Sequence, residues 1–175
     1  RRPLAEMPPP DLARLYDEHA SALFAFALNV TRHEADTRDV LQEVFRKLAA
    51  RPELLRDVRD ERGFLLRLAH HAAIDQMRRR STRERNHEQF ATESITLFAP
   101  TADPDEAAFR RELAEALGEL PVEQRTVVHL KLWEGLTFEQ IATALDIPLN
   151  TAASRHRYGL DKLRARLRPL YDEIK

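Results

Sequence analysis

The chain has no cysteine among its 175 residues, which excludes disulfide bonds and thiolate-ligated metal sites and fits a reducing cytoplasm. Its four glycines are scattered singly, so neither common glycine-rich phosphate loop can form. No apolar run approaches the roughly 18 residues that a membrane span needs, so no membrane insertion is expected. No secretory signal is visible, and Arg1 at the first position indicates a trimmed or partial N-terminus.

Helical periodicity is abundant by contrast. Hydrophobic residues make up 43% of the chain and charged residues 33%, which allows a buried core in a soluble protein. Apolar residues recur at steps of three and four, and no segment alternates with a period of two over a useful length. These stripes predict helices over residues 12–30, from Leu41 to Arg51-Pro52, and from Phe64 to about Arg80. We therefore predict an all-α fold.

The middle of the chain changes character. Residues 91–105, ATESITLFAPTADPD, contain two prolines and no helical stripe. We predict two small helical domains, residues 1–90 and 106–175, joined by a flexible linker over 91–105. An alternative stays open, in which the apolar residues of this segment dock on a neighbouring surface: Ile95, Leu97 and Phe98.

The second half reads as further helices followed by a helix-turn-helix. One helix should stop at Pro121, and Gly135 is placed like the C-cap of the next. Thr137 and Gln140 have the spacing of a capping box that opens a helix. A turn is expected at Asp146-Ile147-Pro148, after which Asn150 or a neighbour should cap a last, long helix.

The formal net charge of −1 conceals separate patches. Residues 78–85, RRRSTRER, hold five arginines against one glutamate. Residues 149–168 form a second basic set, in which Asp161 is the only acidic residue. Acidic residues gather at the start of the second helix: Glu34, Asp36, Asp39 and Glu43. Patches of opposite sign fit a protein that binds both a nucleic acid and a basic protein surface. The alternative is that each patch is simply a solvated face.

Three stretches resemble the extracytoplasmic-function (group 4) sigma factors, a branch of the sigma-70 family of RNA polymerase sigma factors. They are DVLQEVFRKL (39–48), GFLLRLAHHAAIDQMRRR (63–80) and the helix-turn-helix from 137 to 164. The order of acidic helix, basic helix, linker and helix-turn-helix also matches, over residues 11–85 and 106–168. The resemblance implies a protein that binds core RNA polymerase and promoter DNA and directs promoter recognition and transcription initiation.

In such a protein the first domain would be region 2-like and would bind core polymerase and the −10 element. In the family, the acidic helix docks on a coiled coil of the largest polymerase subunit, and the largest and second-largest subunits are both expected partners. Asp39 and Glu43 are one turn apart and would grip basic side chains there, whereas Val44 and Phe45 should face the core. The residues implicated in polymerase binding are Asp36, Asp39, Gln42 and Glu43.

The third helix resembles the one that melts the −10 element and holds the non-template strand. Single-stranded DNA is held by cations along its backbone and by platforms for unstacked bases. The loop from Asp57 to Gly63 aligns with the family loop that captures a flipped base. The family often has Trp near Phe64 and Asn at the position of His71, so the family's −10 preference is not carried over to this chain. The residues implicated in −10 binding are Arg67, His71, Arg78, Arg79 and Arg80.

The second domain would be region 4-like and would bind the −35 element. Arg157 is the first choice for base readout, because arginine on guanine is the commonest specific contact, while Arg155 and Lys162 would contact phosphates. Many relatives carry a basic residue at Ala153. Arg164, Arg166 and Arg168 either contact DNA or solvate the helix end. The residues implicated in −35 binding are Asn150, Thr151, Ala153, Ser154, Arg155, Arg157, Tyr158 and Lys162.

No nucleophile–base pair or metal set is assembled, so we expect no enzyme, no catalytic residue, no cofactor and no metal. His70, His71 and Asp75 come nearest to a metal site, but adjacent histidines point to different faces and a third ligand is missing. Two alternatives stay open. A stand-alone helix-turn-helix regulator would lack the acidic helix, and a sigma-like decoy for an anti-sigma factor would not need RRRSTRER. An anti-sigma factor is also a candidate partner of the sigma factor itself.

Overall fold

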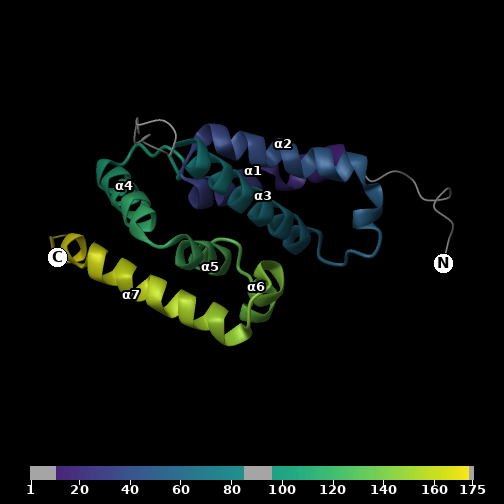
Figure 1. Ribbon diagram of the computed structural model, residues 1–175. Coiled ribbons are helices and arrows are strands. Elements are labelled where there is room, and N and C mark those ends of the chain that lie inside the picture. The colour runs from purple at the N-terminus through teal and green to yellow at the C-terminus, as the bar shows by residue number, and fades with distance from the viewer. Residues whose placement is uncertain (1–10, 85–95, 174–175) are drawn as a thin grey trace.

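The computed structural model describes residues 11–84 and 96–173, and within these ranges the regular structure is helical, without strands (Figure 1). This confirms the all-α fold. None of the helices in the described ranges combines the length and apolarity needed to cross a membrane. The helices are α1 (Leu12–Thr31), α2 (Glu34–Ala50), the short 3₁₀ helix η2 (Pro52–Leu55), α3 (Glu61–Glu84), α4 (Pro104–Glu119), α5 (Val122–Leu132), α6 (Phe138–Leu145) and α7 (Leu149–Glu173).

Local capping signals set several helix ends. Asp11 caps α1 by accepting a hydrogen bond from the Arg14 backbone N–H at 2.9 Å. The predicted capping box of α6 is confirmed, with both reciprocal bonds between Thr137 and Gln140 present. Asp146 ends α6 in the left-handed region at φ 54°, which makes the turn of the helix-turn-helix.

Helices α1, α2 and α3 pack on one another as a bundle along one side of the molecule (Figure 1). Phe26, Leu48 and Leu65 are completely buried between them. Val44 is buried as predicted, and Phe45 packs edge-on against Tyr16 with ring centroids 5.1 Å apart. The outward face of α2 is therefore left to its polar residues.

The two halves of the chain share the main hydrophobic core. Phe26 of α1 belongs to the same buried cluster as Val127 and Leu130 of α5 and Ile141 of α6. Helix α5 packs against α1, and α6 packs against α3 (Figure 1). The sequence predicted two domains with separate apolar faces, but in the structure those faces are buried against each other. The exact boundaries at residues 90 and 105 stay a prediction.

A smaller core cluster lies between α4, α5 and α7. Leu97 and Phe98, from the segment expected to be a flexible linker, are half-buried and pack against this cluster. Phe98 also lies 6.1 Å from the ring of Trp133. For these two residues the docking alternative is confirmed, whereas Ile95 and the rest of residues 85–95 lie outside the described residues.

Candidate functional site

The outward face of α2 carries the predicted acidic surface. Asp39 and Gln42 are exposed, and Glu43 lies one turn beyond Asp39 on the same face. Gln76 of α3 donates a hydrogen bond to Asp39 at 3.2 Å, and Arg46 pairs with Glu43. Because these contacts are at the surface, a basic partner could exchange with them at little cost.

Asp36 is placed differently from the other three predicted polymerase-binding residues. Its carboxylate is 8% exposed and faces α3, where Gln76 and Arg80 each approach it to 3.3 Å. The imidazole of His33, which caps α2, lies 3.3 Å from the same carboxylate. Asp36 therefore ties α2 to α3 beneath the exposed surface, since a step of three residues is about 300° and so places Asp36 about 60° around the helix axis from Asp39.

A groove of about 360 Å³ runs between α2 and α3. Its α2 wall carries Asp39 and Glu43 together with Arg46, and its α3 wall carries Arg79 and Arg83 together with Asp75. Charges of both signs therefore line the groove, with carboxylates in excess on α2 and arginines in excess on α3.

The arginines of α3 differ in how exposed they are. Arg67, Arg78 and Arg79 are exposed, and Arg78 has only a loose pair with Asp75 at 3.8 Å. Arg80 is half-buried against Asp36. Arg67, Arg78 and Arg79 are therefore accessible from solvent, while Arg80 is engaged within the protein; Arg85 lies outside the described residues.

The neighbouring histidines of α3 point to different faces, as the sequence predicted. His71 is exposed, whereas His70 turns toward α5 and α7. Burial, together with the nearby charges of His71 and Arg155, lowers the pKa of His70 to about 4. His70 is therefore neutral at pH 7, and its Nδ1 atom has no hydrogen-bond partner in the described residues.

Helices α6 and α7 form the predicted helix-turn-helix. The backbone N–H of Ile147 donates to the carbonyl of Ala142 at 3.0 Å, which closes the turn. Ala142 is half-buried in the main core and Ala152, on the first turns of α7, is completely buried. Small residues at these positions let the two helices approach closely, which leaves the opposite face of α7 available for contacts.

Four of the eight predicted −35 residues are exposed on α7. Asn150, Arg157, Tyr158 and Lys162 are exposed, and the guanidinium of Arg157 stacks 4.9 Å from the ring centre of Tyr158. Such stacking holds a planar guanidinium in one orientation. The half-buried members of the set are Thr151, Ala153, Ser154 and Arg155.

Farther along α7, Arg164 and Arg166 form ion pairs within the protein. Arg166 pairs with three acidic residues of α4, at 3.1 Å from Glu119, 3.3 Å from Glu112 and 3.8 Å from Glu115. Arg164 pairs with Asp161 at 3.5 Å. These contacts favour the interpretation in which the end of α7 is solvated and docked, at least for Arg166.

Arg155 lies where the two halves meet. It lines a cleft together with His70 and Ile74 of α3 and Val122 and Thr126 of α5. The recognition helix is thus partly covered by α3 at the position of one expected phosphate contact.

Two arginines that the sequence analysis did not single out cross the same interface. Arg125 is 5% exposed and donates to the carbonyls of Asn29 at 2.6 Å and Val30 at 2.9 Å, in the last turn of α1, and to Leu120 at 2.7 Å. Arg32, just past α1, donates to the carbonyl of Ala114 in α4 at 2.8 Å. The carbonyls of Asn29 and Val30 lie at the end of α1, where carbonyls lack partners inside the helix, so the Arg125 guanidinium is well suited to them.

A second polar bridge lies beside the first. The Asn29 amide lies 3.1 Å from Nδ1 of His129, whose Nε2 faces Glu134 at 3.4 Å. Arg62 of α3 donates to the other carboxylate oxygen of Glu134, its Nε at 3.0 Å. Burial pushes the pKa of Glu134 upward, but its bonds with His129 and Arg62 dominate and lower it, so Glu134 is ionised.

Only one signal in the sequence could have indicated these residues. Arg125 and His129 are one turn apart in VEQRTVVHLKLW, within a helix whose centre also holds the apolar Val127, Val128 and Leu130. A charged residue that falls on a buried stripe requires a specific partner. The partner, at the end of α1 almost a hundred residues away, has no signature in the local pattern.

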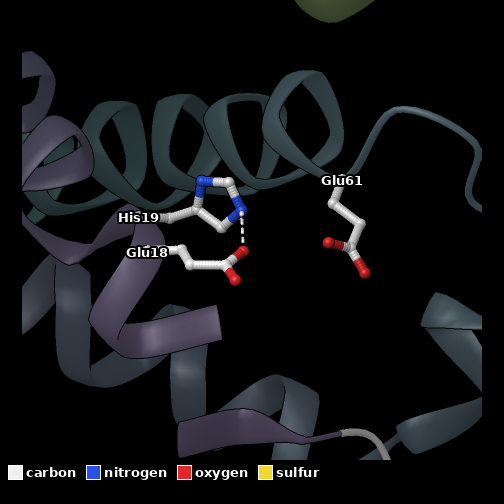
Figure 2. Close-up of side chains that lie close together, drawn as sticks. All are labelled: Glu18, His19 and Glu61. Carbon is white, nitrogen blue, oxygen red and sulfur yellow. Dashed lines mark ion pairs between the residues drawn. The ribbon is translucent and has the colours of Figure 1, made fainter. Parts of the chain in front are cut away.

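The described residues contain one cluster with the ligand types of a metal site: Glu18, His19 and Glu61 (Figure 2). Arg14 already binds both carboxylates, at 2.8 Å each. A cation would have to displace this guanidinium, so the cluster is better explained as an ion-pair network that joins α1 to α3.

Comparisons with known proteins match both halves of the chain. The family profile of Sigma-70 region 2 matches residues 15–83, which span α1 to α3, and that of Sigma-70, region 4 matches residues 116–165, which include the helix-turn-helix. The first matched segment contains the acidic and basic surfaces, and the second contains the recognition helix.

Two curated relatives extend over most of the chain. The ECF RNA polymerase sigma factor SigL of Mycobacterium tuberculosis is 38% identical over 158 residues, which cover 89% of this chain and 88% of SigL. The ECF RNA polymerase sigma factor SigX of Bacillus subtilis is 28% identical over 165 residues, with 91% and 85% covered. Among solved structures, the sigma factor RpoE of Bartonella quintana, crystallised with the anti-sigma factor NepR, has the same fold, with a TM-score of 0.77 at 20% identity and 90% and 97% coverage.

Proposed function

We propose residue roles for this chain, which belongs to the extracytoplasmic-function (ECF) RNA polymerase sigma factors of the sigma-70 family. It is a transcription initiation factor that binds core RNA polymerase and directs it to promoters. The observation that carries the residue assignment is that an acidic surface on α2, a basic surface on α3 and a recognition helix at the start of α7 occur on one chain. The chemistry of RNA synthesis belongs to the polymerase, so the chain acts by binding.

For core polymerase, we assign Asp39, Gln42 and Glu43. Asp39 and Gln42 are exposed and Glu43 is half-buried on the same face of α2, and this placement supports the assignment. Asp36 acts beneath them by fixing α2 to α3 through Arg80 and Gln76. Close charge pairs at an interface fix the register of docking as well as adding affinity.

For the −10 element, we assign Arg67, Arg78 and Arg79 to the backbone of the non-template strand. Their guanidinium groups are exposed, and successive arginines on a helix can follow several phosphates. His71 is exposed on the same helix and is available to a base as a hydrogen-bonding ring. Arg80 is assigned to the link with Asp36, where it supports the helix that carries the others.

For the −35 element, we assign base readout to Arg157, which Tyr158 holds in position, with Asn150 beside them on the exposed start of α7. Lys162 is exposed and suits a phosphate. Arg155 lies in the cleft that also contains His70 of α3, so it reaches DNA only when α7 separates from α3 at this point.

An anti-sigma factor is a further proposed partner, supported by the complex in which RpoE of Bartonella quintana was solved. We also propose a cytoplasmic location, which follows from the need to meet polymerase and DNA. Compared with a stand-alone regulator or a pure decoy, a sigma factor is the function that requires both the α2 surface and the α3 arginines.

The test is promoter-directed transcription with reversed charge on α2. Asp39→Lys with Glu43→Lys should abolish co-purification with core polymerase and run-off transcription, because both side chains would repel a basic partner. The matched control reverses two exposed acids outside this surface, Asp17→Lys with Glu53→Lys, and should behave as wild type. If the α2 double variant binds core polymerase as well as the control does, the assignment of this surface is wrong.

A further inference from the structure

The last turn of α3 carries hydroxyl side chains among its arginines. Ser81, Thr82 and Arg83 are all exposed, so their side chains make little tertiary contact. The Thr82 hydroxyl donates to the carbonyl of Arg78 at 3.0 Å, and such a bond competes with the backbone hydrogen bonds of the helix. A helix end of this kind opens locally at small cost, which makes its hydroxyls accessible to an enzyme that binds an extended segment.

The angle around the helix distinguishes Thr82 from Ser81. At about 100° per residue, Thr82 lies about 40° from Arg78 and about 60° from Arg79 around the axis of α3. It therefore stands between the two arginines assigned to the DNA backbone, at the spacings where side chains on one helix face meet. Ser81 lies about 60° from Arg78 but about 160° from Arg79, so it adjoins only the first of them.

The same arginines make this turn a suitable substrate for one class of enzyme. Thr82 follows three consecutive arginines in RRRST, residues 78–82. Protein kinases select substrates by the pattern of charge around the hydroxyl, and a kinase with an acidic substrate cleft favours arginines shortly before it. The sequence and the exposure of Thr82 together satisfy this requirement.

We propose that Thr82 is a phosphorylation site that switches off the DNA-binding cations of α3. The enzyme is an arginine-directed serine/threonine kinase, and the co-reactant is ATP. The Thr82 Oγ1 attacks the γ-phosphorus, and the bond from that phosphorus to the β,γ-bridging oxygen breaks as the new O–P bond forms. ADP leaves with the electron pair of the broken bond, and the hydroxyl proton passes to a carboxylate of the kinase.

The phosphate would then occupy the arginines in place of DNA. It carries about −1.5 to −2 charge at pH 7 and offers strong acceptor oxygens to guanidinium groups. Arg78 can turn to it readily, because its pair with Asp75 is loose, at 3.8 Å, and both side chains are exposed. The loss of DNA binding rests on the proposed function of Arg78 and Arg79, whereas the pairing of the phosphate with them is a property of this chain alone.

The site itself is tested by treating the full chain with a purified arginine-directed kinase and ATP, followed by mapping of the product by mass spectrometry. Thr82 should be modified. Thr143 of α6 is the internal control, because it is exposed and its hydroxyl donates to the carbonyl of Glu139 at 2.9 Å in the same way. No arginine precedes Thr143 at the spacings found for Thr82, so it should stay unmodified.

Pairing of the phosphate is tested without DNA. Phosphorus NMR of the chain with phosphothreonine genetically encoded at position 82 should show a second phosphate pKa below the ordinary value of about 6, because nearby cations favour the dianion. Arg78→Ala with Arg79→Ala, carrying the same phosphate, should return this pKa toward its ordinary value.

The effect on DNA is tested with the holoenzyme and a fluorescent single-stranded −10 oligonucleotide at several salt concentrations. Phosphate on Thr82 should flatten the slope of log affinity against log salt by about 1.4 and weaken binding about 25-fold at about 0.1 M salt, as two lost contacts require. In the Arg78→Ala, Arg79→Ala background it should change the slope little further. Thr82→Glu should act in the same direction more weakly, Thr82→Gln should match wild type, and Ser81→Glu should flatten the slope by at most about 0.7.

Modification of Ser81 without Thr82, an ordinary phosphate pKa or an unchanged salt slope after phosphorylation would each overturn the switch. Oligonucleotide binding by the unmodified holoenzyme that does not depend on salt would instead overturn the proposed role of the α3 arginines. The mapping and the phosphate pKa would still decide whether Thr82 is modified and whether its phosphate pairs with Arg78 and Arg79.

Discussion

The three consecutive arginines at the end of α3 should contribute differently to DNA binding, because the structure gives them different surroundings. Arg78 and Arg79 are exposed, whereas Arg80 lies 3.3 Å from the buried carboxylate of Asp36. Each phosphate of single-stranded DNA that a protein cation neutralises contributes about 0.7 to the slope of log affinity against log salt. Arg78→Ala with Arg79→Ala should therefore flatten that slope by about 1.4. Between 50 and 200 mM salt, this makes the variant's loss of affinity about sevenfold smaller than that of wild type.

Arg80→Ala should act on stability instead. It removes a cationic partner from Asp36, which keeps Gln76 and the His33 ring, so we expect a loss of about 1–3 kcal/mol in the free energy of unfolding. The assay is binding of a fluorescent single-stranded −10 oligonucleotide to the holoenzyme at several salt concentrations, with urea unfolding of each free variant. An equal change of slope for Arg80→Ala, or an unchanged slope for the double variant, would refute this division of roles.

Three further outcomes are expected. In selection of −35 variants, Arg157→Ala should lose discrimination at one base position, by about 1–3 kcal/mol, whereas Arg155→Ala should weaken all sequences alike. Burial depresses the pKa of His70 to about 4. The contribution of the neutral His70 ring to the free energy of unfolding is therefore complete above about pH 6.5 and is lost as the pH falls toward 4. In unfolding experiments over this pH range, the stability of His70→Leu should depend less on pH than that of wild type. In thermal unfolding, Asp36→Asn should lower the midpoint and Asp39→Asn should not, since only the former carboxylate is buried between helices; equal midpoints would contradict the placement of Asp36.

Local signals in the sequence were sufficient for the helices and for the exposure of many candidate site residues. The capping box of Thr137 and Gln140, the turn at Asp146 and the stripe that buries Val44 depend on neighbours within about one turn of helix, so pattern alone predicts them. The same holds for the exposed acids of α2. Asp36 shows the limit of this reasoning, because charge and spacing group it with Asp39 whereas the helix angle turns it toward Arg80.

The meeting of the two halves could not be predicted in this way. Two groups of amphipathic helices separated by a polar, proline-containing segment indicate two domains. Periodicity does not say whether the apolar faces are buried within each domain or against the other domain. Arg125 shows the difficulty most clearly, since its acceptors are main-chain carbonyls of α1 and any helix end offers such groups. Only the three-dimensional structure identifies which helix end it uses.

Run-off transcription with purified core RNA polymerase and a promoter library tests the assigned function most directly. The wild-type chain should direct initiation from promoters that share a −35 and a −10 sequence, and the Asp39→Lys, Glu43→Lys variant should direct none. Initiation that is no more selective with the chain than with core polymerase alone would contradict its role as a promoter-directing sigma factor.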